Sequence, residues 1–304
     1  MDAGNAAART DRPARLAVGV VSAGRVGAVV GASLAAAGHQ IVAASGVSRE
    51  SVRRAETLLP EVPLRPPDEV VSSADLVVLA VPDDVLAGLV TGLSNAECFR
   101  PGQIVLHTSG AHGIATLAPA STRGVLPLAL HPVMTFTGRP EDVQRLAACS
   151  VGVTAAAGDE AAWSVAEALV VEMGAEPVRV PESVRPLYHA ALAHGANHLI
   201  TLVRDSVDIL ERAGITPADR LIAPLLSAAL DNALRHGDRA LTGPVARGDA
   251  GTLRTHLREL AENAPETVGS YRALAERTAH RAEAAGLLPE HAAAQVLTAL
   301  EDIP

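Results

Sequence analysis

Seven short apolar runs alternate with helix-like stretches between residues 16 and 180, and this alternation restricts the possible folds more than any other feature. The runs are residues 16–21, 39–44, 76–81, 103–108, 124–130, 150–155 and 177–180. Such continuous apolar runs are typical of strands buried on both faces, as in a parallel sheet covered by helices. We therefore predict an α/β domain with a doubly wound parallel sheet over residues 14–181.

The pattern changes after residue 181. Strand-like runs cease, and amphipathic stretches follow at residues 184–213, 217–236, 249–262, 265–285 and 289–301. The breaks between these stretches contain Gly214, Gly237, Gly248 and Gly286, and glycine is common where helices end. We predict a second, all-helical domain over residues 182–304.

The turn after the first predicted strand has the spacing of a dinucleotide-binding motif. Its residues are Ser22, Ala23, Gly24, Arg25, Val26 and Gly27. They occupy the place of G-x-G-x-x-G between a strand and a helix, where Gly24 would let the backbone approach a pyrophosphate and Gly27 would let the helix pack closely. The helix N-terminus favours the negative charge of the pyrophosphate. We predict that this turn of a Rossmann domain binds a dinucleotide. Ser22 departs from the motif, which has glycine there, so a purely structural turn is the alternative to dinucleotide binding.

The end of the second predicted strand indicates which dinucleotide binds. An NAD-binding domain places a carboxylate there, about 20 residues beyond the glycine turn, on the ribose 2′-hydroxyl. In this chain Ser45, Ser48 and Arg49 occupy the region, and no carboxylate precedes Glu50. A hydroxyl and a guanidinium suit a 2′-phosphate, so we predict NADP as the cofactor. The alternative for Arg49 is a solvated residue that starts the next helix.

Two further strand ends are predicted to border the cofactor. Val81 and Pro82 follow one strand and Ser109 follows the next, at carboxyl ends, where ligands of open α/β sheets bind. For these positions a simple turn is the alternative.

Composition excludes several classes of protein. The net charge of -9 argues against a nucleic-acid-binding protein, which needs a basic surface. No apolar run approaches the roughly 18 residues of a membrane span, and residues 1–13 lack the apolar core of a signal peptide, so we expect a polar tail, a cytoplasmic location and no membrane partner. The two cysteines are not in a metal-ligand spacing, and we predict no metal site.

Several longer motifs resemble one family. They are HTSG at 107–110, ALHPVMTFTG at 129–138, RPLYHAALAHGANHL at 185–199 and ALTGPVARGD at 240–249. With the glycine turn, they resemble the actinobacterial Rossmann-like proteins that carry a C-terminal domain of unknown function, DUF2520, from Leu16 to about Leu300. That family is similar in architecture to pyrroline-5-carboxylate reductase, ketopantoate reductase, imine reductases and F420-dependent NADP reductases. The resemblance implies an NADP-dependent oxidoreductase with a small-molecule substrate, dimeric through its helical domain, and by association with pantothenate biosynthesis it suggests ketopantoate.

The resemblance also directs attention to the first helix of the second domain. In ketopantoate and β-hydroxyacid reductases this helix carries a lysine, with an asparagine one turn later, facing the nicotinamide. All 25 basic residues of this chain are arginine, but Asn197 is a counterpart of the asparagine. We predict that His189, eight residues earlier and near the same helix face, is the general acid, and that Asn197 donates a hydrogen bond to the substrate oxygen. Tyr188 is an alternative acid, and a structural polar role is the alternative for His189 and Asn197.

Three other residues complete the candidate site. His131 follows a strand and is the second-choice acid, with a buried histidine bonded to the backbone as the alternative. Ser109 is predicted to contact nicotinamide or substrate. Arg247 lies at a helix break, where its guanidinium would clamp a substrate carboxylate from its own or a partner subunit, unless it forms only a surface salt bridge.

The function predicted from these residues is reduction of a small oxo- or imino-acid by NADPH. The alternatives are a non-catalytic dinucleotide sensor or interaction protein, and an F420-dependent NADP reductase.

Overall fold

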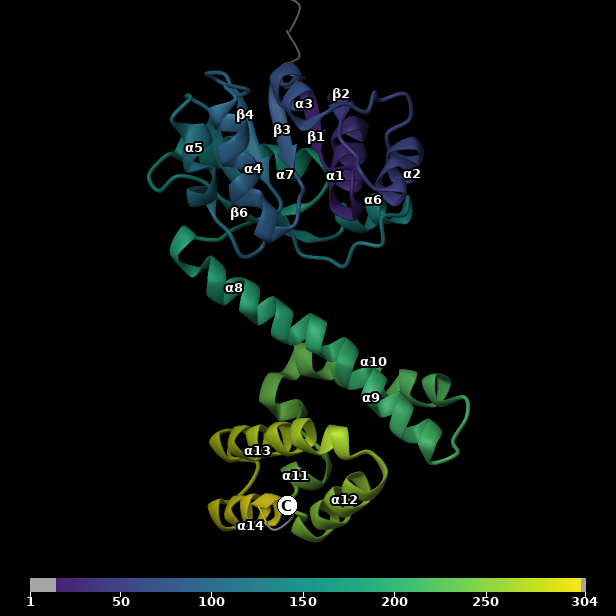
Figure 1. The fold of residues 1–304 in the computed structure, drawn as a ribbon. Helices are drawn as coiled ribbons and strands as arrows, with labels where there is room; N and C mark the ends of the chain where they lie inside the picture. Colours follow the sequence, from purple (N-terminus) through teal and green to yellow (C-terminus); the bar gives the residue numbers. More distant parts are fainter. Residues whose placement is uncertain (1–14, 302–304) are drawn as a thin grey trace, which may run out of the picture. The chain divides into compact units, whose positions relative to one another are not determined.

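The computed structural model describes residues 15–301, and the predicted polar tail at 1–13 lies outside them. The chain divides into two compact units between Ala193 and His194 (Figure 1). The sequence placed the domain boundary at 181/182. The first unit extends further because the helix α8 (Arg185–Leu192) is tied to the sheet by hydrogen bonds of Arg185 and Tyr188.

The first unit is built on a seven-stranded sheet with the order β2-β1-β3-β4-β5-β6-β7. Its strands are β1 (Ala17–Val21), β2 (Gln40–Ala44), β3 (Leu76–Leu79), β4 (Ile104–His107), β5 (Leu126–Pro132), β6 (Ser150–Thr154) and β7 (Glu176–Arg179). Each predicted apolar run therefore contributes one strand, and the predicted fold class is confirmed. The sheet is mostly parallel, but β6 runs antiparallel to β5.

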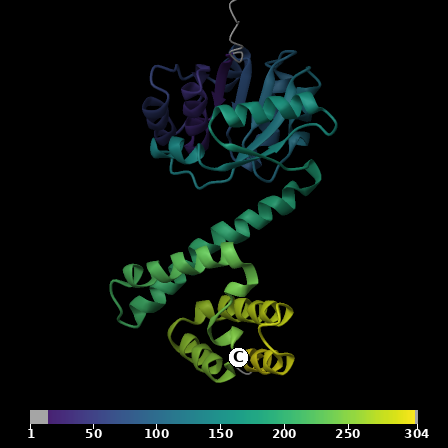
Figure 2. The ribbon, with the colours of Figure 1, turned by 180° about the vertical axis from the view of Figure 1, so that it is seen from behind.

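Helices cover both faces of this sheet because side chains alternate along each strand. In β3, Leu76 and Val78 belong to one hydrophobic cluster, and Val77 and Leu79 belong to the other. The first cluster packs against α1 (Arg25–Ala36), α2 (Arg49–Leu58), α6 (Glu141–Leu146) and α7 (Glu160–Glu172). The second packs against α3 (Pro67–Ser73), α4 (Asp83–Asn95) and α5 (Ala118–Ser121). Figure 1 shows α4 in front of the sheet, and Figure 2, from behind, shows the opposite face.

The second unit is entirely helical. After a π-helical turn at Ala193–Asn197 it contains α9 (His198–Arg212), α10 (Ala218–His236), α11 (Gly243–Ala246), α12 (Ala250–Asn263), α13 (Val268–Ala284) and α14 (Glu290–Glu301). The predicted helices are confirmed. Leu253, Leu257, Ala279 and Val296 lie in the core shared by α11 to α14, whereas α9 and α10 pack on each other. None of the helices in the described residues is long and apolar enough to span a membrane.

Candidate functional site

The first part of the candidate site lies where the strand order reverses. The chain passes from β1 to β2 on one side and then to β3 on the other side of β1. In such sheets ligands bind in the crevice at the carboxyl ends of the strands that flank this point. The turn from Ser22 to Gly27 follows β1, and Val81 and Pro82 follow β3, with Pro82 as the N-cap of α4.

Ser22 adopts the backbone conformation for which the motif uses glycine. Its φ angle is 74°, in the left-handed region that few non-glycine residues occupy. The Ser22 N–H donates to Ser45 Oγ over 2.8 Å, and the Ala23 N–H donates to the Ser45 carbonyl oxygen over 2.6 Å. Ser45 is buried, so in this structure it holds the turn against the end of β2. The missing glycine therefore does not change the course of the turn.

Both remaining glycines of the turn create space for a ligand or for close packing. Gly24 is the N-cap of α1, and no side chain caps this helix, so its first N–H groups are available to an anion. A Cβ on Gly27 would collide with the Ser22 carbonyl oxygen and would lie 2.9 Å from Ala80 Cβ. These are the features expected of a pyrophosphate cradle, and Arg25 is exposed beside it.

The residues predicted for the 2′-phosphate lie at the start of α2. Ser48 is its N-cap, and its hydroxyl accepts a hydrogen bond of 3.1 Å from the Ser51 N–H. Arg49 is exposed, and no carboxylate within residues 15–301 pairs with it. Its guanidinium is thus free to meet a phosphate. Sequence reasoning missed Arg54, which lies against Gly138 in the loop after β5. A Cβ on Gly138 would lie 2.7 Å from Arg54 Nε and 3.1 Å from Arg25 Cγ. No local sequence signal links these positions, because the loop brings them together.

The second part of the candidate site is a cluster of rings at the carboxyl ends of β4 and β5. The Tyr188 hydroxyl and His131 Nδ1 are hydrogen-bonded over 2.8 Å. The rings of His131 and His189 meet edge to face, with centroids 6.0 Å apart. A Cβ on Gly110 would lie 2.5 Å from His189 Cδ2 and 2.8 Å from His131 Nε2, so only glycine lets this loop approach both rings. The structure thus brings together the three predicted acids: His189, the second choice His131 and the alternative Tyr188.

Arg185 anchors this cluster, and sequence reasoning did not single it out. Its side chain is fully buried. Its Nη1 donates to Thr154 Oγ1 and its Nη2 donates to the Ser109 carbonyl oxygen, both over 2.7 Å. Its Nε has no acceptor among the described residues. The guanidinium carbon lies 5.9 Å from the centre of the Tyr188 ring.

Burial and the positive charge of Arg185 determine the charge states of His131 and Tyr188. Burial, followed by the neighbouring Arg185 cation and His189, lowers the pKa of His131 to about 4. His131 is therefore a neutral imidazole near pH 7. Burial raises the pKa of Tyr188, while Arg185 acts in the opposite direction.

Ser109 is buried beside the cluster and has protein partners. Its hydroxyl accepts a hydrogen bond of 3.1 Å from the His112 N–H, and its own N–H donates to His107 Nδ1 over 3.2 Å. These bonds shape the turn after β4 and leave the hydroxyl proton available. Its predicted contact with nicotinamide or substrate stays a prediction.

Asn197 and Arg247 belong to the second unit, where both are exposed. Asn197 ends the π-helical turn, which interrupts the regular spacing on which its shared face with His189 was predicted. Arg247 follows α11 as its C-cap. Their roles at the substrate stay predictions. Within residues 15–301, no group of three His, Cys, Asp or Glu side chains is arranged to hold a metal ion.

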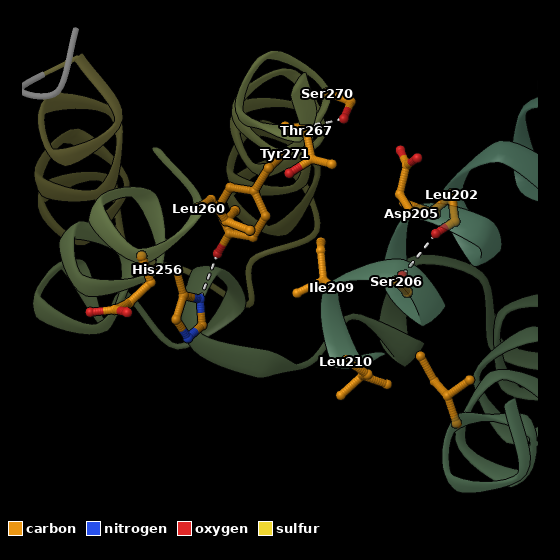
Figure 3. Close-up of a pocket in the computed structure, with 12 residues that line it drawn as sticks. Leu202, Asp205, Ser206, Ile209, Leu210, His256, Leu260, Thr267, Ser270 and Tyr271 are labelled. Atoms are coloured by element: carbon orange, nitrogen blue, oxygen red, sulfur yellow. Dashed lines mark hydrogen bonds between the residues drawn. The ribbon is translucent and has the colours of Figure 1, made fainter. Parts of the chain in front are cut away.

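The second unit also contains a cavity of about 410 Å³ (Figure 3). Leu202, Ile209 and Leu210 of α9 give it a largely apolar lining. Its polar groups include Tyr271, whose hydroxyl is hydrogen-bonded to His256 Nδ1 over 2.8 Å. None of the predicted catalytic residues lines this cavity.

Comparison with protein families divides the chain into two regions. Residues 1–132 match the model of a Rossmann-like domain. Residues 149–278 match the model of a domain of unknown function, DUF2520, which thus begins near β6 of the first unit and includes α8. No curated protein matches the chain.

Solved structures share the fold across both units. A candidate NADP oxidoreductase from Bacteroides fragilis aligns with a TM-score of 0.71 and 19% identity over 87% of this chain and 98% of its own. An imine reductase from Pseudomonas sp. aligns with a TM-score of 0.57 and 14% identity over 95% of this chain and 93% of its own. Pyrroline carboxylate reductase from Plasmodium falciparum, solved with NADP bound, aligns with a TM-score of 0.54 and 10% identity over 93% of this chain and 98% of its own. At these identities the similarity is one of fold.

Proposed function

We propose that this chain, a Rossmann-like protein with a C-terminal DUF2520 domain, is an NADPH-dependent reductase of small oxo- or imino-acids. One observation carries the proposal. The uncapped N-terminus of α1, at the point where the strand order reverses, and the cluster of His131, Tyr188 and His189 both lie at carboxyl ends of parallel strands of one sheet. A dinucleotide cradle and a group of proton donors are the two parts that a hydride-transfer enzyme needs.

The residues present fit NADP. The N–H groups after Gly24 would hold the pyrophosphate, and Arg49 would hold the 2′-phosphate. Val81 and Pro82 would border the bound dinucleotide from the end of β3. The bound cofactor supplies a hydride.

The protein must supply the other components of the reaction. Reduction of a carbonyl requires a proton for the developing alkoxide. His189 is half-buried beside Gly110, and its ring has no hydrogen bond within the described part of the chain, so its nitrogens are available to a substrate. Asn197 and Arg247 are proposed to orient the substrate oxygen and carboxylate.

Oxidation of NADPH in the presence of candidate substrates tests this function. The panel comprises 2-oxo acids that include ketopantoate, cyclic imines, and F420 in its two redox states. We expect turnover with at least one oxo- or imino-acid, and ketopantoate is the first to test. NADPH binding without turnover of any of them would contradict the proposal and favour a dinucleotide sensor, and turnover of F420 alone would favour the F420-dependent NADP reductase.

A further inference from the structure

The hydrogen bond between Tyr188 and His131 joins α8 to the end of β5. The geometry points to a proton relay in which His131 Nε2, rather than His189, protonates the oxygen of a substrate carbonyl while the Tyr188 hydroxyl passes its proton to His131 Nδ1. This inference rests on the reductase function proposed above. It also names the substrate class, because a carbonyl oxygen needs this proton and a protonated imine does not.

The backbone around the pair is shaped to hold this hydrogen bond. His131 lies opposite Gly152 in the register of β5 and β6. A Cβ on Gly152 would lie 2.5 Å from the Tyr188 hydroxyl, so the glycine provides the space that the phenol occupies. When Nδ1 accepts a hydrogen bond from the phenol, the neutral ring carries its single proton on Nε2. That nitrogen lies next to Gly110, in the loop that follows β4 at the carboxyl edge of the sheet.

The relay needs a group that stabilises the phenolate it leaves behind, and Arg185 has the required position. Its guanidinium carbon is 5.9 Å from the centre of the Tyr188 ring. Its two terminal nitrogens donate to neutral acceptors, and no carboxylate in residues 15–301 forms an ion pair with it. A buried cation without an anionic partner is costly, and a nearby phenolate would offset that cost. Arginine itself cannot supply the proton.

The steps balance as follows. The carbonyl carbon accepts the hydride, and the electron pair of the broken π bond moves to oxygen. The oxygen takes the proton from His131 Nε2, and His131 Nδ1 takes the proton from Tyr188, which becomes a phenolate. A proton from water then reaches Nε2, and the Nδ1 proton returns to the phenolate. One turnover therefore consumes one hydride and one solvent proton.

A relay is needed because His131 has only one proton to give. Burial and the Arg185 cation lower the pKa of His131 and keep its ring neutral near pH 7. The neighbouring His189 acts in the same direction, and the Asp83 carboxylate acts in the opposite direction. A neutral imidazole that lost its proton without replacement would become an anion. The phenol proton prevents this, which makes His131 the proposed catalytic residue and Tyr188 and Arg185 its positioning residues.

The first test does not require a substrate. Nitrogen-15 NMR of the full chain at neutral pH distinguishes the two tautomers of His131, and the His131→Gln variant identifies its signals. We expect an unprotonated Nδ1 and a protonated Nε2. A proton on Nδ1 would mean that the histidine donates to the tyrosine, which would overturn the relay.

The second test compares substrates. Tyr188→Phe keeps the ring and removes the proton, so we expect kcat for a 2-oxo acid to fall about 10²–10³-fold, with KM nearly unchanged. A cyclic imine in its protonated form should react at close to the parent rate. The control is Tyr271→Phe, which removes the other tyrosine hydroxyl of the chain, also hydrogen-bonded to a histidine over 2.8 Å.

The outcomes separate the two proposals. If the parent protein reduces no member of the panel, the reductase function fails and the relay fails with it. If the parent reduces only imines, or if Tyr188→Phe reduces a 2-oxo acid at the parent rate, the relay alone fails. Equal losses on both substrate classes would assign Tyr188 a structural role and would also overturn the relay.

Discussion

At the scale of single residues, Gly27 determines whether the turn after β1 can form. Replacing it with alanine would force a methyl group against the Ser22 carbonyl oxygen and Ala80. We expect Gly27→Ala to destabilise the protein by about 1–3 kcal/mol and to abolish most NADPH binding, because the turn must shift. Thermal unfolding and cofactor titration measure the two effects.

A second glycine variant provides the control. Gly88 is exposed in α4, and a Cβ there would meet nothing within 4 Å. Gly88→Ala should stabilise the protein by about 0.5–1 kcal/mol and leave NADPH affinity unchanged. If Gly27→Ala behaves like Gly88→Ala, the turn does not depend on close packing and its proposed role is wrong.

The roles of some residues can be predicted from the sequence, and those of others cannot. Gly24, Gly27 and Arg49 were identified from local spacing, because the turn and the strand end that carry them are local structures. Arg185 and the pairing of Tyr188 with His131 were not, because 57 residues separate the two rings. Such contacts depend on where α8 packs on the sheet, which no spacing in the sequence specifies.

At the scale of elements, the ends of β4 and β5 each contain a histidine that makes folding sensitive to pH. Burial lowers the pKa of His107 to about 4, and burial followed by Arg185 lowers that of His131 to about 4. The usual value in an unfolded chain is about 6.5. Between these values the unfolded chain binds more protons, so stability present above pH 6.5 is lost as the pH falls towards 4.

Urea unfolding followed by Trp163 fluorescence measures this effect, because Trp163 lies in α7 of the first unit. We expect the free energy of unfolding to fall by about 3 kcal/mol per histidine between pH 6.5 and 4. His131→Gln should reduce this loss of unfolding free energy by about half, whereas His291→Gln, at an exposed position of α14, should not change it. An unfolding free energy that is constant over this range would show that neither histidine is held neutral.

The elements themselves were largely predictable. All seven apolar runs form strands, because a strand that is buried on both faces consists of consecutive apolar residues and is easily recognised in the sequence. The predicted parallel sheet is wrong for β6, which runs antiparallel to β5, because an apolar run reads the same in either direction. The π-helical turn at Ala193–Asn197 also has no signature among the residues that form it.

At the scale of the whole molecule, the exposed apolar side chains of α10 support the predicted homodimer. Leu225 is 68% exposed and Leu234 is 80% exposed, although both lie in a long helix of the second unit. Apolar groups concentrated in this way usually mark an interaction surface. We expect sedimentation to give twice the chain mass of 31.1 kDa.

Charge substitutions test that surface. Leu234→Arg should produce monomers, whereas Val171→Arg, at an exposed position of α7, should leave the dimer intact. A parent protein that sediments as a monomer would contradict the prediction. A parent dimer that tolerates Leu234→Arg would place the interface elsewhere.

The central claim is that the carboxyl edge of the first unit holds NADPH, and titration calorimetry with NADPH and NADH tests it most directly. We expect NADPH to bind at least about tenfold more tightly, because a charge-assisted phosphate contact contributes roughly 1.5–3 kcal/mol. Arg49→Ala should erase most of that preference. Arg123→Ala, which removes a partly exposed arginine paired with Glu97, should preserve it. Equal affinity of the parent protein for the two cofactors, or no binding of either, would contradict the account.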